Sequence, residues 1–104
     1  MTVGQLIRTA RECVGLTQKE LAARIRKEDG TPISPPYLND IERDRRNPPA
    51  VPLLAQFAAE LGLSAEYLYF LACAYPPDIA RLEGTPEAVE AAWQAFRGAL
   101  AGDA

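Results

Sequence analysis

Signals for the start and the end of helices recur at short intervals along the 104-residue chain and constrain its fold. Polar capping residues precede several segments of regularly spaced apolar residues, and glycine or paired prolines follow these segments. Within these segments, apolar residues recur at spacings of three and four, which is the period of a helix with one buried face. Apolar residues make up 48% of the chain, enough for a packed core. The sequence shows no strand pattern, so it predicts an all-α fold.

The first two expected helices are closely spaced, and the second is short. Thr2 caps the first, whose apolar stripe ends near Val14 and whose stop signal is Gly15. Thr17 caps the second, and Glu20 three residues later completes a capping box. The second helix is expected to span about eight or nine residues.

The middle of the chain contains a long loop and two more helices. The segment 26–32 has the composition of a loop and is expected to extend the second helix slightly before bulging outward. Ser34 caps a third helix over 34–44, with Pro35 at its first position. A fourth helix is expected over about 52–61.

Two further helices are expected in the second half of the chain. Ser64 caps one that ends before the proline pair at 76–77, and a short turn is expected around 78–82. Thr85, followed by proline and glutamate, begins the last helix. The apolar stripe of that helix consists of Val89, Trp93, Phe96 and Leu100.

Charge is distributed unevenly between the two halves. The net charge is -3, yet residues 1–52 carry nine basic and seven acidic side chains, whereas residues 53–104 carry two and seven. A basic front half can bind a polyanion even in an acidic chain. The net charge is therefore only weak evidence against nucleic-acid binding.

Composition argues against catalysis and metal binding. The chain has no histidine, which excludes histidine-based zinc sites and Ser-His or Cys-His nucleophiles. Its adjacent carboxylates at 28–29 lie in an exposed loop segment, where nothing raises a pKa. We therefore expect no enzymatic activity, no metal and no cofactor.

The cellular setting follows from the cysteines and from hydropathy. Cys13 and Cys73 lie in apolar-periodic segments without a CxxC motif, so buried, reduced thiols are expected. The sequence has neither an apolar run long enough for a transmembrane helix nor a signal peptide. A cytoplasmic, nucleoid-associated protein without membrane contact is the expectation.

An ordered set of motifs carries a family resemblance over residues 3–71. The motifs are Leu16-Thr17-Gln18-Lys19-Glu20-Leu21-Ala22, Ile33-Ser34-x-x-Tyr37-Leu38-x-x-Ile41-Glu42-Arg43, Arg46-Asn47-Pro48, Glu60-Leu61-Gly62-Leu63 and Ser64-x-x-Tyr67-Leu68. Together they resemble the Xre or Cro/cI-like helix-turn-helix DNA-binding family, the phage-repressor type. The resemblance implies a five-helix lambda-repressor-like domain, here followed by an additional C-terminal helix.

The resemblance places the third helix in the major groove of double-stranded DNA. This chain departs from the family where Pro35 and Pro36 replace polar side chains, because proline cannot donate a hydrogen bond. Pro36 can still pack on a thymine methyl group. The remaining candidate base readers are Ser34, Tyr37, Asn39, Asp40 and Arg43. For Tyr37 and Asn39, a packing or solvated role stays open beside base contact.

Phosphate contacts are expected around this helix. The resemblance places Gln18 over the DNA backbone, flanked by Thr17 and Lys19. Further candidates are Arg26, Lys27, Arg43, Arg45 and Arg46, of which the last three form a basic cluster past the third helix. The alternative for the cluster is a solvated run of charge, and for the loop residues an insertion without a role. The family also implies an ion pair between Glu42 and Arg46, and burial of Leu21, Ala22, Leu38 and Ile41 between the two helices.

The chain is expected to divide into a DNA-binding domain, residues 1–74, and a C-terminal extension, residues 75–104. The stripe of Val89, Trp93, Phe96 and Leu100 can pack on its own domain or form a homodimer interface. Dimerisation is favoured because one helix-turn-helix unit contacts few bases. Tyr67, Tyr69, Phe70 and Tyr75 either frame that interface or fill the core.

These features predict a sequence-specific, homodimeric DNA-binding transcriptional regulator. Repression is favoured over activation because the chain has little room for an activation or ligand domain. The alternative is an antitoxin-like interaction module that keeps the fold, lacks operator recognition and binds a regulatory protein partner. The net charge and the two prolines support that alternative.

Overall fold

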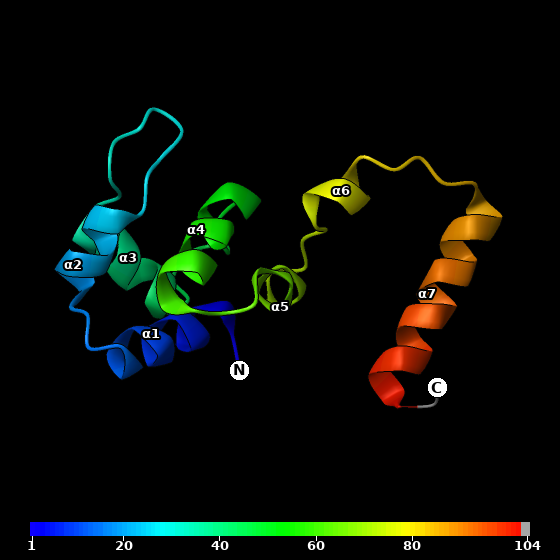
Figure 1. The fold of residues 1–104 in the computed structure, drawn as a ribbon, viewed down its shortest axis with the longest axis horizontal. Helices are drawn as coiled ribbons and strands as arrows, with labels where there is room; N and C mark the ends of the chain where they lie inside the picture. The colour runs from blue at the N-terminus through cyan, green and yellow to red at the C-terminus, as the bar shows by residue number, and fades with distance from the viewer. Residues whose placement is uncertain (103–104) are drawn as a thin grey trace.

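The computed structural model describes residues 1–102, and the described part of the chain is helical (Figure 1). Its helices are α1 Val3–Cys13, α2 Gln18–Arg24, α3 Pro35–Glu42, α4 Val51–Leu61, α5 Ala65–Leu71, α6 Pro77–Ala80 and α7 Pro86–Ala101. All six expected helices are present, and the turn expected at 78–82 is the four-residue helix α6. None of the helices described is long and apolar enough to cross a membrane.

Side-chain caps fix where most of these helices begin. The oxygen of the capping residue accepts a hydrogen bond from the backbone N–H three residues later, which satisfies a donor that the helix leaves without a partner. These capping residues are Thr2, Thr17, Ser34, Ser64 and Thr85. The capping box predicted for Thr17 and Glu20 is confirmed.

One apolar core joins α1 to α5. It includes Ile7 of α1, Leu21 of α2, Leu38 of α3, Phe57 of α4 and Leu68 of α5, and all five are fully buried. The predicted burial of Leu21, Ala22, Leu38 and Ile41 between the second and third helices is confirmed. Helix α3 packs on both α1 and α2, and α4 packs on α1 and α5.

Gly4 permits the close approach of α1 to the end of α3. A Cβ atom at this position would collide with the backbone carbonyl oxygen of Ile41 and lie 2.6 Å from the Asp44 carboxylate. The Thr2 hydroxyl donates to that carboxylate at 2.7 Å, which ties the start of α1 to the same turn. The close approach at Gly4 brings the polar side of α1 alongside α3.

The expectation that the 26–32 loop extends the second helix is wrong. Helix α2 ends at Arg24, and Ile25 is already extended and buried. The chain then forms a narrow hairpin with an isolated antiparallel bridge between Arg26 and Pro32. Gln56 of α4 clamps this hairpin: its Oε1 accepts from the Arg26 N–H at 2.6 Å, and its Nε2 donates to the Arg26 carbonyl at 2.8 Å. The outward bulge itself is confirmed (Figure 1).

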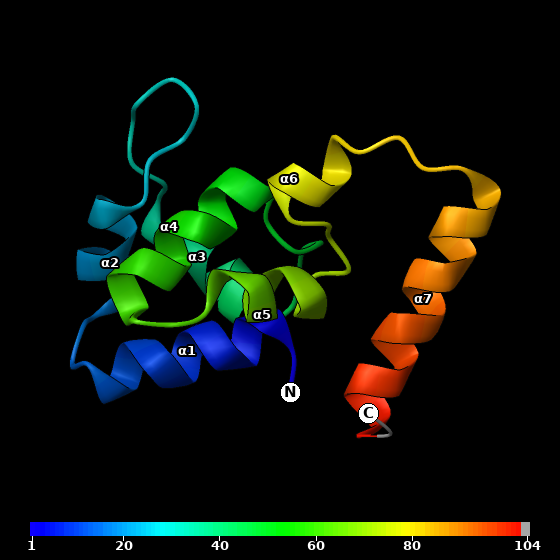
Figure 2. The same ribbon diagram turned by 45° about the vertical axis from the view of Figure 1, so that its right-hand side comes forward.

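Helix α7 lies apart from the core, on the side of the molecule opposite α2 and α3 (Figures 1 and 2). No residue of α6 or α7 is buried. Helix α7 contacts the rest of the chain through aromatic rings: the Phe70 and Phe96 centroids are 6.1 Å apart, and those of Tyr75 and Trp93 are 6.3 Å apart. The last helix is therefore not a sixth core helix.

The predicted burial of both cysteine thiols is also wrong. Cys13 and Cys73 are both exposed. The buried stripe of α1 ends at Ala10, so Cys13 in the last turn lies beyond the core. Cys73 follows α5 and has a φ of 56°, outside the helical geometry that its apolar spacing suggested.

Candidate nucleic-acid interface

Helix α3 is buried on one side and open to solvent on the other. Leu38, Ile41 and Glu42 are buried against α1 and α2. On the other side, Pro36 is exposed and Asn39 is half-buried. The same solvent-facing side continues past the helix into the exposed residues 43–48. An eight-residue helix held this way presents a rigid edge to a partner.

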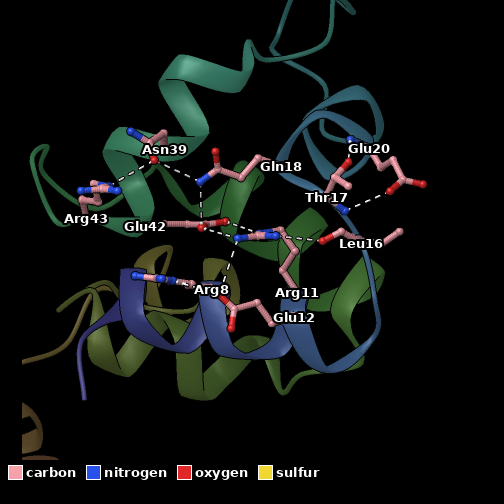
Figure 3. A network of polar contacts seen from close by, with 10 residues as sticks. All are labelled: Arg8, Arg11, Glu12, Leu16, Thr17, Gln18, Glu20, Asn39, Glu42 and Arg43. Carbon is pink, nitrogen blue, oxygen red and sulfur yellow. Dashed lines mark hydrogen bonds and ion pairs between the residues drawn. The ribbon is translucent and has the colours of Figure 1, made fainter.

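An ion pair between α1 and the end of α3 lies under this edge (Figure 3). The Arg11 Nε and Nη2 atoms donate to the two Glu42 carboxylate oxygens at 2.7 and 2.9 Å. Arg11 Nη1 also donates to the Leu16 carbonyl at 2.8 Å, which fixes the turn before α2. The hydrogen bond with Glu42 raises the pKa of Arg11, although partial burial opposes this shift.

The expected ion pair between Glu42 and Arg46 is therefore wrong. Glu42 is turned inward toward Arg11, because it occupies the buried side of α3 while residue 46 lies beyond the end of the helix. Arg46 instead approaches Asp40, with 3.4 Å between Nε and the carboxylate. Its guanidinium also stacks over the Tyr37 ring at 4.8 Å from the centroid. The Arg46 side chain thus lies against the outer face of α3.

A network of hydrogen bonds links α2 to the exposed side of α3 (Figure 3). Gln18 Nε2 donates to Asn39 Oδ1 and to Glu42 Oε1, both at 3.1 Å. Arg43 Nε donates to the same Asn39 oxygen at 3.3 Å. Two donors thus occupy the Asn39 oxygen, and its amide nitrogen lies on the side away from the network. Asn39 is set up to donate hydrogen bonds outward.

The structure brings most of the predicted contact residues together on one side of the molecule. One group is Gln18, Asn39 and Arg43, and the other is Tyr37, Asp40 and Arg46. Arg45 lies near the second group, 3.9 Å from Asp40. Thr17 and Ser34 are occupied as helix caps, and Lys19 is exposed in the first turn of α2.

Arg26 and Lys27 do not join these groups. Both are exposed residues of the hairpin, and Arg26 bonds the carbonyl of Gly30 within it at 3.3 Å. The dimerisation candidates Val89, Trp93, Phe96 and Leu100 lie on α7, on the far side of the molecule (Figure 2). They are between 41% and 61% exposed, so the chain leaves this stripe largely uncovered.

Sequence reasoning missed Arg8 and Arg11 of α1. With Gln18, Asn39, Glu42 and Arg43 they line a polar hollow of about 160 Å³ between α1, α2 and α3. The available signal was the spacing of two arginines on the polar face of the first helix. Its significance depends on the packing of α1 against α3. Within residues 1–102, no group of three or more carboxylate or thiolate side chains is placed to hold a metal ion.

Comparison with known proteins identifies the fold that holds these residues. Residues 7–68 match the family model described as helix-turn-helix (HTH_3). The chain belongs to the helix-turn-helix family. This confirms the resemblance that the motifs carried, and the matched region runs from α1 into α5.

Relatives of this helix-turn-helix protein include two uncharacterized HTH-type transcriptional regulators from two strains of Mycobacterium tuberculosis. Each is 39% identical over 66 residues, which is 64% of this chain and 42% of the relative. The chain thus matches less than half the length of these relatives.

Two solved structures are also similar. One is the master regulator for biofilm formation SinR in complex with DNA, with a TM-score of 0.53 and 28% identity over 64% of this chain and 97% of that one. The other, a complex of the SinR and SinI proteins, has a TM-score of 0.53 at 22% identity over 95% of this chain and 79% of that one. The second shows likeness of fold alone.

Proposed function

We propose that this protein is a transcriptional regulator that binds double-stranded DNA by inserting α3 into the major groove. The observation that carries the proposal is the open outer edge of α3. Helix α3 packs on α2, and no other helix of residues 1–102 covers this edge. Helix α7, with its carboxylates at Glu87 and Glu90, lies on the side of the molecule away from α2 and α3 (Figure 2), where it does not repel a phosphate backbone approaching α3. The related SinR structure was solved with DNA.

The proposed base readers are the side chains on this edge. Asn39 donates through its amide nitrogen, because its oxygen already accepts from Gln18 and Arg43. This arrangement favours an acceptor on the base, such as N7 or O6 of a purine, over a bidentate contact with adenine. Tyr37, Asp40 and Arg43 complete the reading surface. Pro36 supplies apolar contact.

The proposed backbone contacts surround these readers. They involve Thr17, Gln18 and Lys19 at the start of α2, Ser34 at the start of α3, Arg45 and Arg46 beyond it, and Arg26 and Lys27 on the hairpin. Gln18 acts chiefly by holding Asn39, since both of its amide N–H groups are occupied within the protein. The arginines supply the charge that phosphate binding requires.

We also propose a homodimer, with residues 1–74 as the DNA-binding unit and residues 75–104 as the dimerisation unit. The support is the uncovered stripe of Val89, Trp93, Phe96 and Leu100 on α7. Two units related by a two-fold axis would contact two half-sites, which is how single helix-turn-helix units gain specificity. A dimer bound over a promoter excludes other proteins from the same DNA, so repression is the proposed outcome.

A second candidate function is a protein-interaction module that does not recognise an operator. The specific observations that favour it are Pro35 and Pro36 at the start of α3, which donate no hydrogen bond to a base, and the exposed aromatic residues of α5 and α7. A regulatory protein partner would cover those aromatic side chains.

Selection of bound sequences from random duplex DNA separates the two functions. A regulator should enrich an inverted repeat, and its affinity should fall with salt with a log–log slope of about -0.9 per phosphate neutralised. Substitution of Asn39→Ala should relax the preference at one base pair by about 1–3 kcal/mol. No enriched sequence together with a flat salt dependence would favour the interaction module.

A further inference from the structure

The hollow between α1, α2 and α3 combines an open shape with a surplus of positive charge. Its volume is about 160 Å³, and its lining contains Arg8, Arg11 and Arg43 against the single carboxylate of Glu42. The lining therefore carries two more positive than negative charges, and Glu12, which pairs with Arg8 at 3.0 Å, lies outside it. Because the hollow adjoins Asn39 and the outer edge of α3, a duplex docked on α3 would bring its backbone to the hollow.

We propose that this hollow seats a phosphate group of the DNA backbone and that Arg8 of α1 is a phosphate-contacting residue; this inference rests on the proposed DNA-binding function. Arg8 comes from the first helix, outside the helix-turn-helix pair. It would extend the contact surface from α2 and α3 onto α1.

The hydrogen bonds decide which lining residues can contact an anion. Arg11 is committed to Glu42 and Leu16, and its side chain is only 12% exposed. Both amide N–H groups of Gln18 donate to protein oxygens. The charged groups left to bind an anion are therefore Arg8 and Arg43, which stand on opposite sides of the hollow with their guanidinium groups at the same edge (Figure 3).

Arg8 is the more available of these two guanidinium groups. Its side chain is 57% exposed, and its one ion pair within residues 1–102 is with the equally exposed Glu12, at 3.0 Å. An exposed ion pair of this kind contributes little free energy, so a phosphate can displace Glu12 at small cost. A guanidinium group also matches two phosphate oxygens with parallel hydrogen bonds.

The test compares four variants of the full chain with the wild-type protein: Arg8→Gln, Glu12→Gln, Arg43→Gln and a control. Dissociation constants for a mixed-sequence DNA duplex are measured by fluorescence anisotropy at several salt concentrations. Substitution of Arg8→Gln should weaken binding on the order of five-fold at low salt and reduce the salt slope by about one per protomer. Glu12→Gln should strengthen binding several-fold, because it removes the carboxylate that competes for Arg8. The matched control is Arg24→Gln, which alters an arginine that is 50% exposed and paired with Glu60 at 3.6 Å, outside the hollow.

The opposite effects of the two α1 variants distinguish phosphate contact from a structural role. Loss of structure would not make Glu12→Gln bind more tightly, and equal melting temperatures for all variants exclude unfolding. If Arg8→Gln keeps the wild-type salt slope while Arg43→Gln lowers it, the inference about Arg8 is overturned and the DNA-binding function stands. If the wild-type protein itself shows no salt-dependent binding and enriches no sequence, the proposed function fails.

Discussion

Glu42 is the one charged residue that is buried in the described part of the chain. Its carboxylate accepts hydrogen bonds from Arg11 of α1 and Gln18 of α2 while its backbone belongs to α3. One side chain thus joins the three helices that surround the proposed DNA-binding surface. A buried carboxylate is tolerated because these donors compensate for the water it loses.

Removal of this negative charge is the first prediction. Glu42→Gln should lower the free energy of unfolding by about 3 kcal/mol, because the largely buried Arg11 then has only the exposed carboxylate of Glu12, at 3.9 Å, as a counter-charge. Urea denaturation followed by circular dichroism measures the change. The matched control is Glu12→Gln, whose carboxylate is exposed and should change stability by less than about 1 kcal/mol. Equal stabilities for the two variants would contradict the role assigned to Glu42.

The capping box of α2 gives a pH prediction. The hydrogen bond that the Thr17 backbone N–H donates to the Glu20 carboxylate lowers the pKa of Glu20. A carboxyl pKa that is lower in the folded state stabilises the protein above its unfolded-state value, and this contribution is lost as the pH falls through the folded-state value. The free energy of unfolding of Glu20→Gln should therefore depend less on pH than that of wild type below about pH 4.5. Superimposable pH profiles would rule out this contribution.

At the scale of elements, the helices were predictable from local signals. The caps at Thr17, Ser34 and Ser64 act within a few residues, so the local sequence specifies where these three helices begin. The apolar stripe of the last helix was also read correctly. Its environment was left open, because a stripe of 3.6-residue period is the same whether the helix covers its own core or another surface.

Contacts between distant residues account for what the sequence did not reveal. Arg11 and Glu42 are 31 positions apart, and their pairing depends on the approach of α1 to α3 at Gly4. The family resemblance pointed instead to Arg46, which is near Glu42 in sequence. The hairpin after α2 depends on Gln56, which is 30 positions from Arg26. No local pattern encodes such a clamp.

The clamp by Gln56 leads to a prediction for the hairpin. Gln56→Ala removes two hydrogen bonds to the backbone of Arg26 and should destabilise the protein by about 1–2 kcal/mol. Amide hydrogen exchange should accelerate most at Lys27 and Ile33, whose N–H groups bond across the hairpin at 2.8 and 2.9 Å. The control Gln94→Ala alters a glutamine on α7 and should leave these two amides unchanged. Unchanged exchange in Gln56→Ala would show that the hairpin does not need the clamp.

At the scale of the whole molecule, the chain is more extended than a compact domain of its length. Its radius of gyration is 15.7 Å, compared with about 13 Å expected from the scaling of globular domains. Helix α7 accounts for the difference, since it stands off the core and makes aromatic contacts with α5 and the segment after it (Figure 1). Exposed aromatic and aliphatic side chains on such a helix are typical of an interaction surface.

The last prediction concerns this surface and the two-fold symmetry that the proposed function requires. Sedimentation should show a dimer for the wild-type protein and a monomer for Trp93→Ala combined with Phe96→Ala, because truncating both rings removes the centre of the apolar stripe. The variant should lose the preference for an inverted repeat over a single half-site, yet retain salt-dependent contact with DNA through α3. Ile79→Ala, which shortens an exposed side chain of α6, serves as the control and should remain dimeric. A wild-type protein that stays monomeric at all concentrations would contradict the α7 interface without affecting the assignment of α3.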